Sequence, residues 1–469
     1  MCGIVVAHSL HDCYGMMSSL QPRGRDAAGM VLVGDRRIDC ITWLGLVKDF
    51  SLRNLYRIFH VERYHTFLGH TRYGTKGRKD QLLRDAHPQT IGGSVHDYGH
   101  HCIILDCDMA IVHNGQVDDE YFAEINKSKL PSDCSDTLKL LHYYKERNEY
   151  EIMQKIPGAY TLAIADKRRP EVIVMRDRTG IKPSALGKKD GKYCIASEDI
   201  ALSDKGAEFK EYLEPGCIYY MLPSDSKPRS QRVVKPQIAY CFFEWNYIAQ
   251  KETVLNRISV KALRQTLGEI LARESRIPET DYIAYMPECP EAAAEAYSRI
   301  SGIPLREILY KIRNERAFQG STSEEREHSI STNLFLNLEA INKIRGKTIT
   351  LIDDSIVRGN NACRARKLLY EEAQVANCHL LNYTPPIGLV GSDNIPRGCM
   401  FGVDMPPNES PNHQFIARGK NLEEIGTAIG MPVHYISVHG MLRGFKSLGM
   451  PREHLCTYCI GGKHPFKTT

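Results

Sequence analysis

Short runs of alternating apolar and polar residues, broken by Gly and Pro, fill the chain from residue 1 to about 222. A period of two is typical of strands with one buried face. Two stretches with helical spacing interrupt these runs, residues 121–128 and 135–148, and a Ser-Asp pair opens the second. The first half of the chain is therefore predicted to be a sheet-rich, layered domain. The runs predicted as strands are CGIVVAH, AGMVLVG, CITWLGL, HCIILD, MAIVHNG, AYTLAIAD, EVIVMRD, YCIASED and CIYYML.

The pattern changes beyond a polar, Pro-bounded stretch at residues 223–236, which we predict to be a linker near a domain boundary. From there on, segments of helical period alternate with short apolar runs. Such alternation favours a parallel sheet with helices on both faces. In order, the segments are the helix VKALRQTLGEILAR, the strand DYIAYMP, the helix EAAAEAYSRIS, the strand TITLIDD, the helix ACRARKLLYEEA, the strand CHLLNYT and the helix NLEEIGTAIG.

Size and composition narrow the class of protein. A chain of 469 residues exceeds the usual limit for one core, so two or three domains are expected. Its 61 basic and 56 acidic residues nearly balance, at a net charge of +5, which gives no sign of a basic stripe for nucleic acid. No apolar stretch approaches the roughly 20 residues that a membrane span needs. The fifteen cysteines then fit a cytoplasmic protein with reduced thiols better than a disulfide framework.

Cys2 is the first residue with candidate chemistry. A small residue at position 2 allows the initiator methionine to be removed, which leaves Cys2 with a free α-amino group. An amine with a pKa of about 8 can accept the thiol proton, so one residue supplies both the nucleophile and the general base for acyl transfer. The alternative is an ordinary cysteine that happens to come second, and Cys2 alone does not decide between the two.

Four motifs follow Cys2 in order, namely Arg23-Gly24-Arg25-Asp26-Ala27-Ala28-Gly29, Gly69-His70-Thr71-Arg72-Tyr73-Gly74-Thr75, His113-Asn114-Gly115 and Ser135-Asp136. Together they resemble the N-terminal-nucleophile glutaminase domains of class II amidotransferases. The resemblance implies an α+β domain with αββα layers over residues 2–235. It also implies that Cys2 attacks the side-chain amide of glutamine.

The same resemblance implies a role for each motif. Arg72 would hold the α-carboxylate of glutamine with a bidentate fork, and Arg23 would belong to the same glutamine site. Asp136 would hold the α-ammonium group. Asn114 and the backbone N–H of Gly115 would form the oxyanion hole for the tetrahedral intermediate. Taken singly, Arg72 also fits a surface ion pair, and Asn-Gly also fits a hairpin turn.

A second motif lies in the C-terminal half, at residues 348–359. An apolar run, two acids and a glycine turn lead into a helix there, an arrangement whose backbone N–H groups can cradle an anion. The carboxylates of Asp353 and Asp354 suit the two hydroxyls of a ribose, with Mg2+ held mainly by a diphosphate. Acids that merely cap a helix are the alternative. The segment resembles the signature of type I phosphoribosyltransferases, and D-D-S-I-V-R-G resembles the version found in the amidophosphoribosyltransferase family.

That resemblance covers nearly the whole chain and implies an α/β type I phosphoribosyltransferase domain with a parallel sheet over residues 255–445. The family has two threonines where this chain has Asn360 and Asn361, although amide N–H groups can also donate to phosphate. The family's mobile loop is eroded at residues 313–318, and a basic stretch is replaced at residues 330–333. Lost cations are expected to weaken polyanion binding or to change the acceptor. The implied site for phosphoribosyl diphosphate and Mg2+ comprises Glu288, Asp353, Asp354, Ser355, Arg358, Gly359, Asn360 and Asn361.

The C-terminal tail, residues 446–469, carries Cys456-Thr-Tyr-Cys459. On its own a C-x-x-C pair fits a redox pair, half of a zinc site or chance. Some members of the amidophosphoribosyltransferase family hold a [4Fe-4S] cluster with two such cysteines and two others, which match Cys241 and Cys399 here. The resemblance thus implies a four-thiolate [4Fe-4S] site that ties the tail to both domains without a redox step, with structural zinc as the alternative.

Taken together, the resemblances imply that ammonia from glutamine crosses inside the protein and displaces diphosphate from phosphoribosyl diphosphate. The products would be 5-phosphoribosylamine, glutamate and diphosphate, the first step of purine synthesis. The family further implies a homo-oligomer, a tetramer or dimer, with purine nucleotides as inhibitors, and no nucleic-acid or membrane partner is expected. Two rivals stay open: a diverged paralogue that aminates another acceptor, and a non-catalytic regulator that binds nucleotides.

Overall fold

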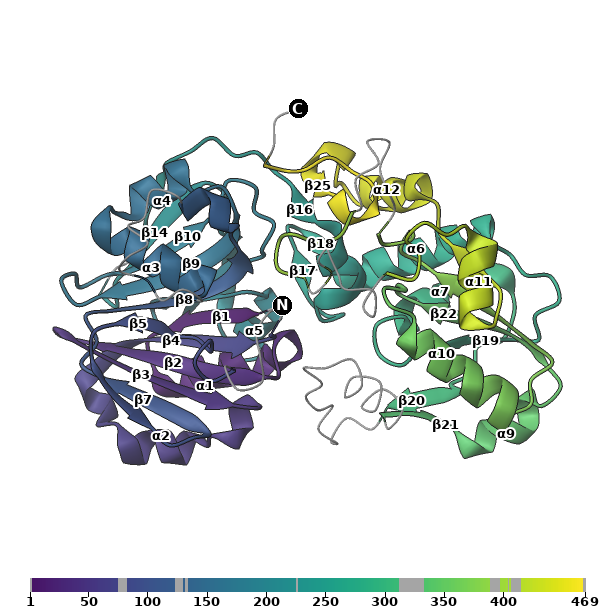
Figure 1. The fold of residues 1–469 in the computed structure, drawn as a ribbon, viewed down its shortest axis with the longest axis horizontal. Helices are drawn as coiled ribbons and strands as arrows, with labels where there is room; N and C mark the ends of the chain where they lie inside the picture. Colours follow the sequence, from purple (N-terminus) through teal and green to yellow (C-terminus); the bar gives the residue numbers. More distant parts are fainter. Residues whose placement is uncertain are drawn as a thin grey trace.

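The computed structural model describes residues 2–74, 82–122, 130, 134–224, 227–311, 333–388, 397–403, 405 and 415–466. None of the helices in these ranges is long and apolar enough to cross a membrane. The predicted eroded loop at residues 313–318 lies outside the described residues, as do most of the helix predicted at residues 121–128 and most of the stretch 330–333. Figure 1 shows two lobes, one built from the purple and blue first half of the chain and the other from the green part.

Two stacked antiparallel sheets form the first lobe, and strand alternation explains the stacking. In β1, Ile4 and Val6 pack between the sheets, while Val5 and Ala7 face the helix α1. Within the described residues one sheet has nine strands and the other six. In sheet order the nine are β13 (Glu208–Tyr212), β11 (Ala185–Lys189), β12 (Lys192–Ala196), β1 (Gly3–Ala7), β4 (Tyr64–Arg72), β2 (Ala27–Gly34), β3 (Arg37–Leu44), β7 (His101–Leu105) and β6 (Ser94–Asp97), and the six are β15 (Arg229–Arg232), β14 (Cys217–Met221), β10 (Val172–Arg176), β9 (Ala159–Asp166), β8 (Met109–Gln116) and β5 (Gln89–Ile91).

Helices cover the outer face of each sheet. The nine-stranded sheet is covered by α1 (Leu10–Ser19), α2 (Leu52–Ile58) and α5 (Asp199–Ser203), whose buried side chains share one core with it. The six-stranded sheet is covered by α3 (Asp136–Glu146) and α4 (Glu149–Lys155). Ser135 caps α3, because its hydroxyl accepts from the Leu138 N–H at 3.2 Å. The predicted αββα layering is confirmed.

The predicted linker at residues 223–236 is wrong in part. Residues 229–232 form β15, the edge strand of the six-stranded sheet, paired with β14. All four of its residues are exposed, so neither face of this strand packs on the core. An edge strand without a buried face has no apolar alternation, which is why the sequence pattern indicated a linker.

A parallel sheet of four described strands forms the core of the second lobe, as predicted. Its middle strand β22 sends Ile349 and Leu351 to one face and Ile352 to the other, so both faces are buried. The helices α6 and α7 pack on the face that carries Ile352, and α10 and α11 pack on the opposite face. The strands, in sheet order, are β19 (Tyr282–Tyr285), β22 (Thr348–Asp353), β23 (Asn377–Asn382) and β24 (Val433–Tyr435), and the helices are α6 (Val260–Glu274), α7 (Glu291–Ser301), α9 (Leu338–Ile344), α10 (Asn360–Lys367), α11 (Leu422–Ile429) and α12 (Val438–Ser447).

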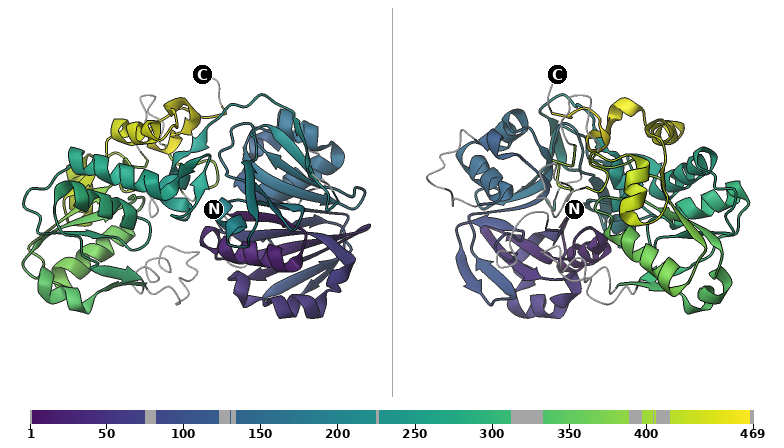
Figure 2. Two further views of the ribbon diagram at one scale, coloured as in Figure 1. Left: turned by 180° about the vertical axis from the view of Figure 1, so that it is seen from behind. Right: turned by 45° about the vertical axis from the view of Figure 1, so that its right-hand side comes forward.

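The end of the chain returns to the junction of the lobes. The strand β25 (Leu455–Cys456) pairs in parallel with β16 (Tyr240–Cys241), which follows the first lobe. A π-helix, η7 (Glu244–Ile248), comes directly after β16. Figures 1 and 2 show the yellow C-terminal segment with α12 lying at this junction from each viewpoint. The remaining short strand pairs are β17 (Val254–Leu255) with β18 (Ile258–Ser259) and β20 (Leu309–Lys311) with β21 (Leu334–Leu336).

Candidate active site

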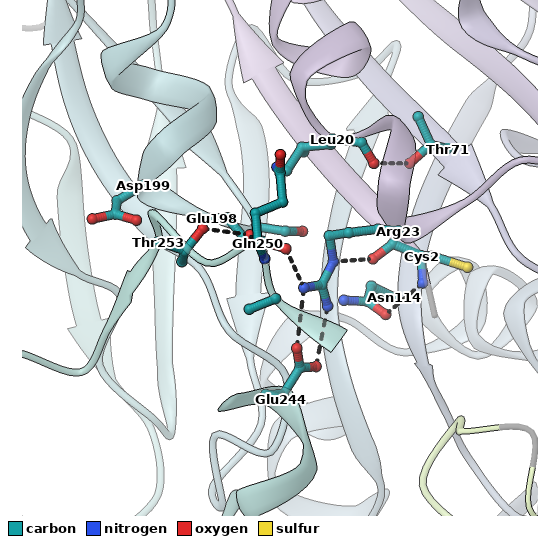
Figure 3. A network of polar contacts seen from close by, with 12 residues as sticks. Cys2, Leu20, Arg23, Thr71, Asn114, Glu198, Asp199, Glu244, Gln250 and Thr253 are labelled. Carbon is teal, nitrogen blue, oxygen red and sulfur yellow. Dashed lines mark hydrogen bonds and ion pairs between the residues drawn. The ribbon is translucent and has the colours of Figure 1, made fainter. Parts of the chain in front are cut away.

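Cys2 lies one residue before β1 and has no register partner in the sheet. Its backbone is held by side chains instead. The Cys2 nitrogen, which becomes the α-amine once Met1 is removed, donates to Asn114 Oδ1 at 3.3 Å. The Cys2 carbonyl oxygen accepts from Arg23 Nε at 2.9 Å. Figure 3 shows Asn114 and Arg23 on the backbone of Cys2, with the sulfur turned away from both.

The thiol of Cys2 is set up to ionise at neutral pH. Burial raises its pKa, but the charge of His70 and a hydrogen bond with His70 lower the pKa more, to about 6. His70 is completely buried on β4, opposite Ile4 of β1, and therefore on the face that Cys2 shares with Ile4. Because the thiolate is the nucleophilic form, Cys2 meets the first requirement of a catalytic cysteine.

Asn114 and Gly115 lie within β8, so the hairpin-turn alternative is excluded. The Asn114 side chain is 1 % exposed, and its Nδ2 has no hydrogen-bond partner among the described residues. A buried donor without a partner costs free energy, and an oxyanion formed beside Cys2 would satisfy it. Gly115 allows a close approach of two strands, because a Cβ there would lie 1.9 Å from the carbonyl oxygen of Ala159.

Arg72 and Asp136, two of the predicted glutamine-binding residues, come from elements next to the strands of Cys2 and Asn114. Arg72 ends β4, next to the strand that Cys2 precedes, and its Nη1 donates to the Leu82 carbonyl at 3.1 Å. At 9 % exposure it is buried, which excludes the surface ion pair. Asp136 opens α3 and reaches to 4.0 Å from His113 Nδ1, beside Asn114. The sequence motifs thus meet around one thiol.

Arg23, predicted to belong to the glutamine site, is bonded to the backbone of Cys2 and to two carboxylates. Its guanidinium donates to Glu198 Oε1 at 2.6 Å and to both oxygens of Glu244 at 3.0 and 3.1 Å, in addition to the Cys2 carbonyl. The three side chains of this ionic cluster are at most 2 % exposed. These contacts are all to protein groups, so the structure points to a supporting role for Arg23 beneath Cys2.

The second site lies at the carboxyl end of β22. Asp353 and Asp354 are 7 % and 8 % exposed and adjacent to one another. Burial, and then the charge of Asp354, raise the pKa of Asp353 well above its usual range, and burial raises the pKa of Asp354 to about 6. Gly359, at φ +92°, precedes the first residue of α10, Asn360, so the helix N-terminus follows the acids as predicted.

Glu288 joins this site from the neighbouring strand. It follows β19, which pairs in parallel with β22, and so the ends of both strands meet at one edge of the sheet. Its φ of +90° is unusual for a residue with a side chain, and such strain is concentrated at functional sites. Tyr247 of η7 interacts electrostatically with Asp354 and Glu288, and also with Tyr73 beside Arg72. The two sites therefore approach each other at the junction of the lobes.

The four cysteines of the predicted cluster line one small enclosed cavity at the junction of the lobes. Cys241, Cys399, Cys456 and Cys459 share it with Phe401 and Tyr458. Each of the four is at most 9 % exposed, and burial raises the pKa of every one of these thiols. Within the described part of the chain, no group of three or more His, Cys, Asp or Glu residues has the arrangement that would hold a metal ion.

The sequence analysis missed Glu198, Glu244 and Lys182. Glu198 follows β12 and has no motif of its own. The completely buried Lys182 lines the cysteine cavity, and a Cβ on Gly402 would lie 3.3 Å from its Nζ and 3.0 Å from the Gly115 carbonyl. A single lysine does not change the hydrophobic periodicity of the sequence. Only the fold could therefore show that Lys182 lies beside Gly402 and the cysteine cavity.

The αββα layers and the nucleophile site, joined to a parallel-sheet domain with paired acids at a strand end, define a glutamine-dependent amidotransferase. Residues 95–204 match the family described as glutamine amidotransferase domain. The amidophosphoribosyltransferase of Methanocaldococcus jannaschii is 30 % identical, with 99 % of this chain and 98 % of that protein covered. That of Pyrococcus horikoshii is also 30 % identical, at 99 % and 96 % coverage. The chain belongs to the amidophosphoribosyltransferase family.

Solved structures agree on the fold. The Bacillus subtilis glutamine phosphoribosylpyrophosphate amidotransferase complexed with ADP and GMP superposes with a TM-score of 0.80, covering 100 % of this chain and 98 % of that one. A structure described as the allosteric regulatory enzyme of purine biosynthesis gives the same TM-score and covers 96 % of its chain. Both are 24 % identical in sequence, so the likeness concerns the arrangement of the domains and their sheets.

Proposed function

We propose that this protein hydrolyses glutamine at Cys2 and transfers the ammonia to phosphoribosyl diphosphate. The observation that carries the first half is the unpartnered Nδ2 of Asn114 beside a thiol with a pKa of about 6. The sulfur attacks the amide carbon, and Asn114 Nδ2 and the Gly115 N–H stabilise the oxyanion. The α-amine of Cys2 protonates the departing ammonia, and water then releases glutamate from the thioester.

The second half of the reaction takes place at the end of β22. Ammonia attacks the anomeric carbon of the sugar, the bond from that carbon to the diphosphate oxygen breaks, and diphosphate leaves with the electron pair. Asp353 and Asp354 bind the ribose hydroxyls, and the N-terminus of α10 binds the 5′-phosphate together with Ser355, Arg358, Asn360 and Asn361. Bound with the diphosphate, Mg2+ would supply positive charge to that leaving group, and Glu288 would lie beside it. The product is 5-phosphoribosylamine, the first intermediate of purine synthesis.

We propose that the cysteine cavity holds a [4Fe-4S] cluster, with structural zinc as the alternative. A four-iron cluster holds its cysteine sulfurs around a larger body. Four buried thiols line one cavity here, and the buried cation of Lys182 lies in the same lining. When bound, the cluster ties the tail to both lobes.

The setting of the protein completes the proposal. All fifteen cysteines lie within the described residues and none is in a disulfide, in keeping with the reducing cytoplasm. The B. subtilis structure contains ADP and GMP, and we propose purine nucleotides as inhibitors of this chain as well. A homo-oligomer, tetramer or dimer, is the expected assembly.

A test measures diphosphate release by iron-replete, anaerobically purified protein with phosphoribosyl diphosphate, Mg2+ and either glutamine or ammonia. Release with both nitrogen sources is the expected result. The second candidate is a paralogue with another acceptor, favoured by Asn360 and Asn361, which stand where the family has two threonines. Glutamine hydrolysis without diphosphate release from either nitrogen source would support that candidate.

A further inference from the structure

The ionic cluster of Arg23, Glu198 and Glu244 joins the catalytic cysteine to the junction of the lobes. Arg23 comes from the short helix before the second strand, Glu198 from the end of β12, and Glu244 from η7 beyond the first lobe (Figure 3). The side-chain exposures are 0, 0 and 2 %. Burial tends to lower the pKa of Arg23, and the charges of Glu244 and Glu198 more than offset this. The guanidinium of Arg23 therefore balances the charge of two buried carboxylates. Removing any one of the three groups would leave a buried charge without its partner.

Arg23 also fixes the position of the nucleophile. Cys2 is outside the ladder of β1, so its place depends on the hydrogen bonds to Asn114 and to Arg23. The bond from Arg23 Nε to the Cys2 carbonyl, at 2.9 Å, is the shorter of the two. Because Glu244 grips both terminal nitrogens of the same guanidinium, a shift of η7 turns the guanidinium and moves the bond to Cys2 with it.

The helix η7 is in turn bonded to the second lobe. Asn246 Nδ2 donates to Thr384 Oγ1 at 2.9 Å, and the Asn246 carbonyl accepts from the Tyr383 hydroxyl at 2.8 Å. The Tyr383 N–H donates to the carbonyl of Asp353 at 3.3 Å. A path of hydrogen bonds thus leads from the Cys2 carbonyl to Asp353 of the sugar site. Within η7 this path follows the backbone from Glu244 to Asn246.

We propose that Arg23 is a positioning residue for Cys2, and that Glu244 makes this positioning depend on how η7 is docked on the second lobe. Glutamine hydrolysis then responds to the state of the phosphoribosyl site through a buried ionic cluster. This inference rests on the proposed function of the two sites. It assigns Arg23 and Glu244 to regulation and places neither on the substrate.

The test compares Glu244→Gln with Glu149→Gln in the full-length, cluster-containing protein. Glu149 is a matched control, because it is also 1 % exposed and paired with an arginine, Arg169, at 2.8 Å, but it is bonded to neither Cys2 nor η7. The readouts are glutamine hydrolysis with and without phosphoribosyl diphosphate and Mg2+, and the rate at which iodoacetamide alkylates Cys2. Ammonia-dependent diphosphate release monitors the second site separately.

In Glu244→Gln we expect glutamine hydrolysis to fall about tenfold and its response to phosphoribosyl diphosphate to be lost, while ammonia-dependent release stays within about twofold. Arg23→Lys should lose the guanidinium contacts to Glu244 and to the Cys2 carbonyl. It should therefore slow both glutamine hydrolysis and the alkylation of Cys2. Tyr383→Phe is a milder variant that keeps the packing and removes only the bond to Asn246, so it should weaken the response without changing alkylation in the absence of ligands.

Two results would overturn the inference. If Glu244→Gln alters the response no more than Glu149→Gln does, η7 does not control Cys2. If Arg23→Lys alkylates and hydrolyses at the wild-type rate, Arg23 does not position Cys2. Failure of the proposed function is a separate result, because wild-type protein would then release no diphosphate even with ammonia, while the alkylation rates would still report on Arg23.

Discussion

The glutaminase site and the phosphoribosyl site differ in how their charges are balanced. Around Cys2 the protein provides the partners itself: His70 lowers the pKa of the thiol, and Arg23 is paired with two carboxylates. At the end of β22 the carboxyls of Asp353 and Asp354 have raised pKa values, because nearby donors and cations offset their burial only in part. The first site is complete in the folded chain, and the second requires the hydroxyls and cations that a substrate brings.

The largest effect should come from removing one site while the other stays intact. Cys2→Ala is expected to lower glutamine-dependent diphosphate release by roughly 10⁴-fold or more, because it removes the thiol that forms the thioester. Ammonia-dependent release should persist, since the β22 site is untouched. Cys363→Ala, at an exposed thiol on α10, is the control and should keep both activities. Glutamine-dependent release by Cys2→Ala would contradict the assignment of the nucleophile.

The next largest effect tests whether the glutaminase site is preorganised for the transition state. Asn114→Ala should lower the kcat of glutamine hydrolysis by about 10²–10³-fold with little change in KM, because the lost donor acts on the oxyanion. Asn148→Ala makes the same chemical change at the cap of α4, where the side chain only accepts from the Glu151 N–H. That variant should lose stability and keep kcat. A rise in KM with unchanged kcat in Asn114→Ala would instead mean that Asn114 binds the substrate.

The pH dependence of Cys2 provides a smaller, graded test. The thiol of Cys2 has a pKa of about 6, so alkylation by iodoacetamide should be independent of pH above 7 and fall about tenfold for each unit below 6. Partial burial raises the pKa of Cys363 above its usual value, so its alkylation should keep rising with pH above 7. In His70→Asn the Cys2 midpoint should move upward. A midpoint unchanged in that variant would exclude His70 as the cause.

The smallest effect concerns the unbalanced acids. A carboxyl whose pKa is raised by folding destabilises the folded protein once it ionises, here as the pH rises through about 6 for Asp354. Asp354→Asn should therefore raise the Tm of the ligand-free protein at pH 8 by about 2–4 °C. The gain should shrink below pH 6 and vanish near pH 4, and diphosphate release should be lost. A lower Tm at pH 8, measured by differential scanning fluorimetry without Mg2+, would show that the pair is not strained.

The sequence pattern predicted the layers and the local chemistry well, because both depend on residues that are close together in the sequence. The alternation in β1 and the motif around Arg72 needed only neighbouring residues. The role of Arg23 could not be predicted, since its partners Glu198 and Glu244 are distant in sequence and carry no periodic signal. The exposed strand β15 was missed because neither face is buried.

The pairing of β16 with β25 has a consequence for the order in which the protein matures. A ribosome finishes the first lobe, with Cys2, long before it synthesises residues 455 and 456, and domains generally fold as they emerge. Until residues 455 and 456 arrive, β16 lacks its partner strand, and η7 depends on its contacts with the second lobe, among them those with Tyr383 and Thr384. A nascent or truncated chain would thus carry its nucleophile without the support for it. The pairing of residues 455 and 456 with β16 therefore completes the junction. Full glutamine hydrolysis is expected only once the domain that receives the ammonia has been synthesised.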